Sequence, residues 1–111
     1  MVAVSEANQC AGCTRVHSRW ALSAGVSETE LESIGLGDLT GLDRQSRAAI
    51  VFAVERVENQ FAGPLEPELG QLVSEQLDNR TLNEIDAVAR VMNFANLTVG
   101  SLERTFRARR L

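Results

Sequence analysis

The residues best suited to chemistry lie close together near the start of the chain. Both cysteines, Cys10 and Cys13, and the only histidine, His17, fall within one short segment. The thiolate is the reactive form of cysteine, and a neighbouring imidazole can take the proton of the thiol. The types and spacing of these side chains therefore predict peroxide or thiol–disulfide chemistry in this segment.

We expect a helix from Ala11 onward, because residues suited to one buried face recur there at steps of three and four. Two cysteines three residues apart at its beginning could bring their sulfur atoms together. His17 would follow Cys13 by one turn on the same face. Its proximity favours Cys13 as the activated thiol and Cys10 as the resolving thiol. The unpaired amides at the helix start instead favour Cys10 as the thiolate, and we give the histidine more weight.

Other interpretations of the same three residues remain open. Free cysteines are common core residues, and a lone histidine could be a satisfied interior side chain. A zinc site would need a fourth ligand from Asp or Glu, since the chain has no further Cys or His. We expect no bound metal and no cofactor.

Composition limits the classes of protein that this chain can represent. Its 111 residues suffice for one compact domain, and the 44% hydrophobic and 23% charged residues are ordinary for a globular protein. A net charge of −4 provides no basic field for nucleic acid. No segment approaches the ~20 apolar residues that a membrane span needs, and the N-terminus lacks the pattern of a secretory signal. We therefore expect a cytoplasmic protein that binds neither nucleic acid nor membranes.

Helix start and stop signals predict an all-α fold of five to six helices. Residues 2–7 suit the last turns of a first helix, and Gly25 suits the end of the second. Capping-box patterns begin at Ser27 and at Thr40, where Asp43 stands three residues later. Proline positions and Asp78-Asn79 then indicate a break at Pro64, a helix from Pro67, and a final helix over about 80–107.

The final helix shows an apolar pattern that we expect to face the interior. A single small domain buries limited surface, so a remaining apolar stripe would favour a subunit interface. The expected interior side consists of Leu82, Ile85, Val88, Ala89, Met92, Ala95, Leu97 and Leu102.

The motif Cys10-x-x-Cys13-x-x-x-His17, followed by Ser18-Arg19-x-Ala21 and Gly25, resembles the signature helix of the AhpD-like alkylhydroperoxidases. These belong to the carboxymuconolactone decarboxylase superfamily. The order of the later helices is similar as well, and Val91–Asn96 is similar to the late asparagine-containing segment of the family. The resemblance implies one helical domain over residues 1–111, assembled as a homo-oligomer (trimer or hexamer). It also implies thiol-based reduction of peroxides, recycled by an electron donor.

The same resemblance implies roles for individual residues. Cys13 would attack the peroxide and become a sulfenic acid, Cys10 would resolve it to a disulfide, and His17 would take part in the proton relay. Relatives with the full relay carry a glutamate twelve positions before the first motif cysteine, which here falls before Met1. The N-terminal helix is therefore expected to be shortened, and Glu6 is either a substitute in the relay or a solvated side chain.

Three functional hypotheses follow. The first is a thiol-dependent peroxidase or disulfide oxidoreductase, with a peroxide or disulfide as substrate and an unknown thiol as reductant. The second is a decarboxylase-like enzyme that acts on a small lactone acid without using the cysteines. The third is a non-catalytic helical oligomer that keeps the motif.

Overall fold

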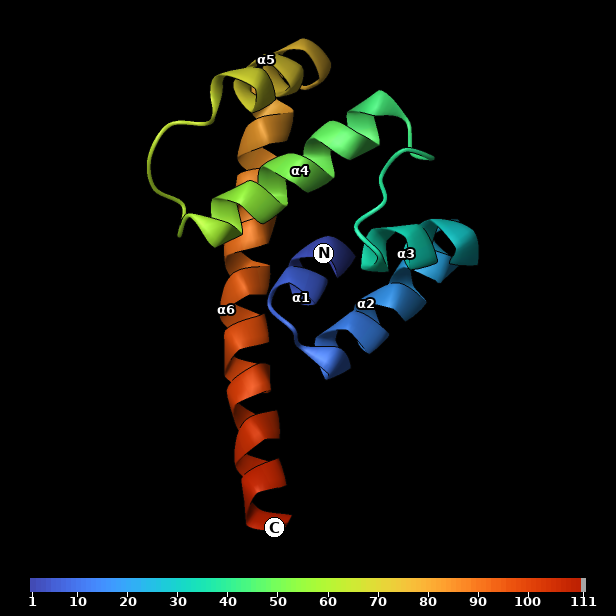
Figure 1. The fold of residues 1–111 in the computed structure, drawn as a ribbon, viewed down its shortest axis with the longest axis vertical. Coiled ribbons are helices and arrows are strands. Elements are labelled where there is room, and N and C mark those ends of the chain that lie inside the picture. Colours follow the sequence, from blue (N-terminus) through green and yellow to red (C-terminus); the bar gives the residue numbers. More distant parts are fainter. Residues whose placement is uncertain (111) are drawn as a thin grey trace.

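The computed structural model describes residues 1–110, and every regular element in that range is an α-helix (Figure 1). The all-α prediction is confirmed. The six helices are α1 (Val2–Ala7), α2 (Ala11–Ser23), α3 (Glu28–Gly35), α4 (Arg44–Glu58), α5 (Pro67–Gln76) and α6 (Asn79–Arg110).

Most of the predicted helix boundaries are correct, and local hydrogen bonds give the reason. The Ser27 hydroxyl accepts from the amide of Glu30 and caps α3, and a carboxylate oxygen of Asp78 accepts from the amide of Thr81 at the start of α6. Gly25 adopts a φ of 100° just after α2, a conformation that favours glycine.

The predicted start of α4 at Thr40 is wrong. Asp43 is the N-cap, since its carboxylate accepts from the amide of Ser46 at 2.8 Å. The Thr40 hydroxyl instead donates to Asp38 at 2.6 Å within the preceding loop. The carboxylate of Asp43 is a stronger acceptor than a hydroxyl, so of the two candidate caps in this stretch the later one begins the helix.

The short helix α1 lies at the centre of the fold and contacts α2, α3, α4 and α6 (Figure 1). Its Val4 packs with Val57 of α4 and Ala89 of α6 in one apolar cluster. A second cluster joins α4, α5 and α6 around Phe52 and Val73. These two clusters fix α4 and α6 as a frame, and α1 is attached to that frame beside the start of α2.

The inward face of α6 changes its chemistry along the helix. Its first half presents the apolar Leu82, Ile85 and Ala89 to α4, α5 and α1. The predicted interior positions Val88, Leu97 and Leu102 are exposed, which corrects that part of the expected core. The ~3.6-residue period of the inward face instead leads on to Asn96 and Glu103. Polar side chains of α6 therefore face α1 and α2.

None of the helices within residues 1–110 combines the length and the hydropathy needed to cross a membrane.

Candidate active site

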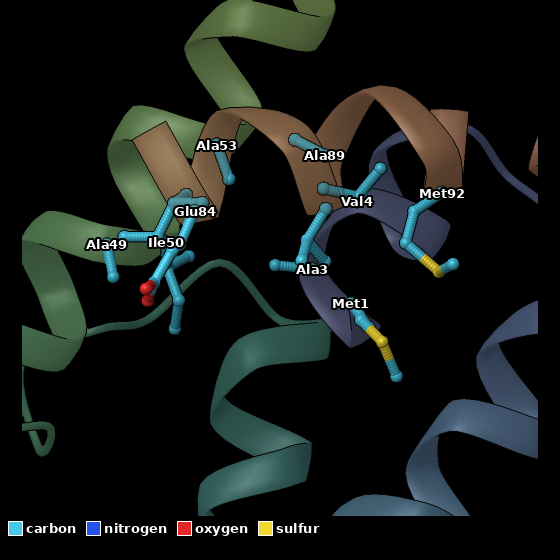
Figure 2. Close-up of a pocket in the computed structure, with 11 residues that line it drawn as sticks. Met1, Ala3, Val4, Ala49, Ile50, Ala53, Glu84, Ala89 and Met92 are labelled. Atoms are coloured by element: carbon cyan, nitrogen blue, oxygen red, sulfur yellow. The ribbon is translucent and has the colours of Figure 1, made fainter. Parts of the chain in front are cut away.

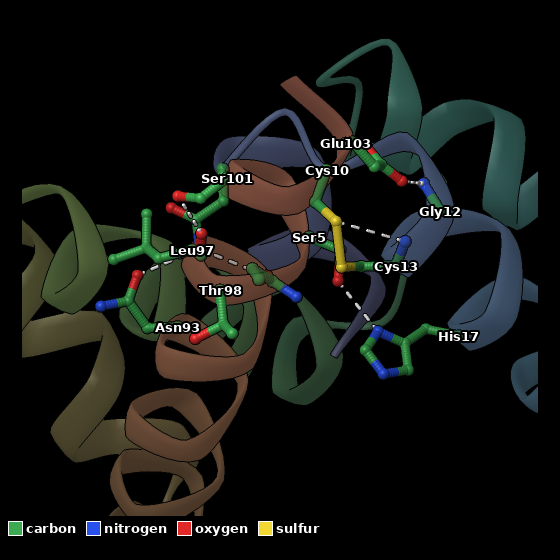
Figure 3. The surroundings of a disulfide bond; sticks show 12 residues. Ser5, Cys10, Gly12, Cys13, His17, Asn93, Leu97, Thr98, Ser101 and Glu103 are labelled. Atoms are coloured by element: carbon green, nitrogen blue, oxygen red, sulfur yellow. Dashed lines mark hydrogen bonds between the residues drawn. A yellow bond between two sulfur atoms is a disulfide. The ribbon is translucent and has the colours of Figure 1, made fainter. Parts of the chain in front are cut away.

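The first turn of α2 carries a disulfide bond between Cys10 and Cys13 (Figure 3). Gln9 adopts a φ of 54°, and this sharp turn separates α1 from α2 immediately before the first cysteine. Cys10 is the N-cap of α2, and its Sγ accepts from the amide of Cys13 at 3.3 Å. The Cα atoms of the two cysteines are 5.2 Å apart, so this local geometry brings the sulfurs together without help from a distant element.

The two cysteines differ in their surroundings. Cys10 has no exposed surface, whereas 8% of Cys13 is exposed. Cys13 is therefore the more accessible of the two cysteines. The amide directed at the sulfur of Cys10 would stabilise a thiolate there in the reduced protein. Exposure thus favours Cys13 as the attacking thiol, and the hydrogen bond from the amide favours Cys10 as the thiolate.

His17 lies on the same helix and is bound to a residue that the sequence did not indicate. Its Nδ1 is 2.9 Å from the hydroxyl oxygen of Ser5, a fully buried residue of α1. The main-chain carbonyl of Ser5 also accepts from the amide of Cys10. Ser5 therefore joins the histidine to the start of the disulfide loop (Figure 3). Within residues 1–110, no hydrogen bond joins His17 directly to either sulfur.

Burial sets the protonation of His17. Only 8% of the residue is exposed, and the ring of Trp20 lies beside it with the two ring centroids 5.3 Å apart. Burial lowers the pKa of His17 below its usual range, and the positive charge of the Met1 amino group acts in the same direction. At neutral pH the imidazole is neutral and able to accept a proton.

The predicted relay candidate Glu6 forms no hydrogen bond with His17. Its side chain is exposed, and it lines an open depression of about 470 Å³ together with Cys10, Thr14 and Arg15. The carboxylate also approaches Gly35 at the end of α3. The hydrogen-bonding partner of His17 is Ser5, the residue that precedes Glu6.

A group of three asparagines fixes the turn between α1 and α2 against α6. The side-chain amide of Asn8 donates to the oxygen of Asn93 at 3.0 Å and to that of Asn96 at 3.2 Å. Asn96 is 99% buried, with its Nδ2 atom unpaired in the structure. The late asparagine-containing segment of α6 therefore holds the loop that leads into the disulfide.

A carboxylate from the far end of the chain reaches the loop between the cysteines. Glu103 of α6 accepts a hydrogen bond from the amide of Gly12 at 3.1 Å (Figure 3). Nothing in the local sequence indicates this contact, because 91 residues separate the two partners.

An apolar cavity of about 260 Å³ lies apart from the disulfide, between α1, α4 and α6 (Figure 2). Among the residues that line it are Met1, Ala3, Val4, Ala49, Ile50, Ala53, Glu84, Ala89 and Met92. Neither cysteine lines it. Within residues 1–110, no three His, Cys, Asp or Glu side chains gather in an arrangement that could hold a metal ion.

Comparison with known families gives a match to the N-terminal part of the chain. A model of the carboxymuconolactone decarboxylase family matches residues 1–55, which include α1, α2, α3 and most of α4. The match contains both cysteines, His17 and Ser5, and it ends before α5 and α6. No curated protein and no solved structure gave a match.

Proposed function

Because the chain belongs to the carboxymuconolactone decarboxylase family through residues 1–55, we propose that it is an AhpD-like thiol peroxidase with Cys10 and Cys13 as its redox centre. One observation carries the proposal. The two cysteines form a disulfide at the start of a helix, one turn before a buried neutral histidine. That arrangement suits a pair of thiols that is oxidised by a substrate and reduced again.

The first step is attack of the Cys13 thiolate on a hydroperoxide. Cys13 is the more exposed of the two cysteines, which supports its assignment as the attacking thiol. An S–O bond forms while the O–O bond breaks, and the leaving alkoxide takes a proton to become an alcohol. The sulfur is oxidised by two electrons to a sulfenic acid.

The second step forms the disulfide. The thiol of Cys10 attacks the sulfur of the Cys13 sulfenic acid, an S–S bond forms, and the hydroxyl leaves as water. An external dithiol then reduces the disulfide by two thiol–disulfide exchanges and is itself oxidised. A Cα separation of 5.2 Å between the cysteines supports direct resolution within one chain.

The proton route in this proposal runs through His17 and Ser5. In the Nδ1–H tautomer of the neutral ring, Nδ1 donates to the Ser5 hydroxyl oxygen and Nε2 keeps a free lone pair. The hydroxyl then orients the ring, and the ring accepts the proton that the reacting thiol gives up. Ser5 takes the position of an orienting partner, whereas Glu6 is exposed and lines an open depression with Cys10.

Peroxide-dependent disulfide formation tests the proposal. An organic hydroperoxide added to the reduced protein should produce the Cys10–Cys13 disulfide, detected by mass spectrometry as the loss of two hydrogens. Cys13→Ser should abolish peroxide consumption, and Cys10→Ser should accumulate a sulfenic acid that dimedone traps. Ser5→Ala should slow the reaction about tenfold or more, consistent with the loss of an orienting group in general base catalysis.

Ser23→Ala is the matched control for Ser5→Ala, since Ser23 is an exposed serine at the end of α2, the helix that carries His17. It should leave the rate unchanged. Turnover of peroxide by the Cys13→Ser variant would contradict the assigned role. Activity on a lactone acid that survives alkylation of both thiols would indicate the decarboxylase-like alternative, and slow thiols of ordinary pKa near ~8.5 would indicate the non-catalytic one.

The proposed cycle also has requirements for its compartment, its electron donor and the assembly of the protein. Repeated reduction of the pair suits a reducing compartment such as the cytoplasm, with a thiol as the electron donor. Apolar side chains exposed along α6 support a homo-oligomer of the kind that the family resemblance implies, a trimer or a hexamer.

A further inference from the structure

The contact between Glu103 and Gly12 places a carboxylate at the start of the helix that carries both cysteines. Gly12 lies between Cys10 and Cys13 and is the second residue of α2, so its amide is one of those left unpaired by the helix. The Oε1 atom of Glu103 accepts from that amide at 3.1 Å. Glu103 is half-buried, and Figure 3 shows its side chain directed at Gly12 beside the disulfide.

The absence of a side chain at Gly12 is what admits the carboxylate. A Cβ atom built on Gly12 would collide with Oε1 of Glu103. The backbone of Gly12 does not need a positive φ, so its conformation does not require glycine. Glycine at this position therefore allows the carboxylate to approach the amide closely.

This carboxylate changes the electrostatics of the pair. Amides and the dipole at a helix start ordinarily stabilise a thiolate, which lowers the thiol pKa and makes the disulfide easier to reduce. Here the amide of Gly12 is occupied by a group that is itself negatively charged. A fixed negative charge near the sulfurs disfavours the thiolate and leaves the neutral disulfide unaffected.

In the described part of the chain, the cationic side chains nearest to Glu103 form no ion pair with its carboxylate. Arg15 of α2 and Arg107 of α6 line a shallow depression together with Glu103, and neither lies within ion-pair distance of its carboxylate. Glu6 of α1 lines a depression with Cys10 and adds a second negative charge near the pair, and His17 is neutral at pH 7.

We propose that Glu103 is a positioning residue of the redox centre that holds the first turn of α2 and makes the Cys10–Cys13 disulfide harder to reduce. This inference rests on the proposed function in one respect, namely that the pair is reduced and oxidised during a cycle. The closing helix thereby acts on chemistry located at the opposite end of the sequence.

The reduction equilibrium of the full-length protein tests this inference without any peroxide. In a glutathione buffer, one protein disulfide and two glutathione thiols exchange with one protein dithiol and one glutathione disulfide. Glu103→Gln keeps an oxygen that accepts from Gly12 and removes the charge. It should shift the equilibrium constant at least threefold toward the dithiol, where a tenfold shift would equal about 30 mV. The pH profile of iodoacetamide reaction should move to lower pH as well.

Two further variants make the result specific. Glu84→Gln removes the same charge from an exposed position near the other end of α6 and should leave both measurements unchanged. Gly12→Ala displaces the carboxylate by its new methyl group and should shift the equilibrium in the same direction as Glu103→Gln. The double variant should then add little to either single change, because both remove one interaction.

The possible results separate this inference from the proposed function. If Glu103→Gln shifts neither the equilibrium nor the pH profile more than Glu84→Gln does, the inference is wrong, whatever the peroxide assays show. If the equilibrium shifts as expected and the wild-type protein consumes no peroxide, Glu103 tunes the disulfide and the peroxidase proposal fails. Circular dichroism of each variant confirms that α-helix content is retained, and Glu103→Gln decides the question even if Gly12→Ala does not fold.

Discussion

At the scale of single residues, folding changes the protonation of His17, which lies next to the disulfide and titrates near neutral pH. In the folded chain burial lowers its pKa, whereas in the unfolded chain the ring is solvated and titrates near the ordinary value of ~6.5. The unfolded chain therefore binds a proton more readily as the pH falls through this range. Burial of the neutral ring has no electrostatic cost above pH ~6.5 and becomes destabilising below it.

Stability should therefore fall as the pH is lowered from about 7 toward 5. Urea unfolding at a series of pH values measures this slope. His17→Gln should flatten the slope in that window, and Arg19→Gln, an exposed change on the same helix, should retain it. Burial also lowers the pKa of the Met1 amino group, which titrates with the same sign at higher pH, so the comparison of the two variants isolates His17. An equal slope in wild type and His17→Gln would contradict the prediction.

At the scale of single elements, the loop before α4 shows how two similar signals compete. Thr40 and Asp43 both stand where a helix could begin, and the structure uses Asp43. The amide and the hydroxyl of Ser46 both donate to the Asp43 carboxylate, and these hydrogen bonds lower its pKa. The amide and the hydroxyl of Thr40 both donate to the Asp38 carboxylate within the loop.

Asp43→Ala should lower the melting temperature, because it leaves the first-turn amide of Ser46 without its partner. Thr40→Ala should have a smaller effect, since Thr40 caps no helix. Thermal unfolding followed by circular dichroism measures both variants. The effect of Asp43→Ala should shrink in acid, as the pH falls from the ordinary carboxyl pKa of ~3.9 through the lower pKa of the folded Asp43, because the protonated carboxyl is a weaker acceptor. A larger loss for Thr40→Ala would show that the helix begins earlier in solution.

At the scale of the whole molecule, the outer face of α6 carries large apolar side chains that the rest of the chain leaves exposed. Large apolar side chains remain exposed there, among them Val91, Phe94 at 74% exposed, Leu102 and Phe106. Trp20 of α2 is also more than half exposed. Monomeric proteins seldom leave so many large apolar groups uncovered on one element, which supports the homo-oligomer of the proposed function.

Phe94→Glu should reduce the oligomer to smaller species, since a carboxylate in an apolar interface is desolvated without a partner. Light scattering coupled to size-exclusion chromatography gives the mass directly. Leu36→Glu is the matched control, because Leu36 is even more exposed but lies alone in the loop after α3. A wild-type chain that elutes as a monomer would contradict the expectation.

The sequence by itself determined the helical architecture and the local arrangement of the two cysteines. Ser27, Gly25 and Pro67 act within one turn of themselves, so their effect on helix ends can be predicted from neighbours alone. The disulfide is equally local, because three residues separate Cys10 from Cys13 and the start of a helix brings them together.

The tertiary structure decided which groups surround that pair. Ser5 meets His17 only because α1 packs on α2, and Glu103 meets Gly12 only because α6 passes the start of α2. Hydrophobic periodicity could not reveal either contact. It identifies a helix face by its apolar residues, and the inward face of α6 carries asparagine and glutamate where it approaches the disulfide. In the sequence, a buried polar residue on the inward face looks the same as a solvated polar residue. Only the packing of the helices determines whether that residue is buried.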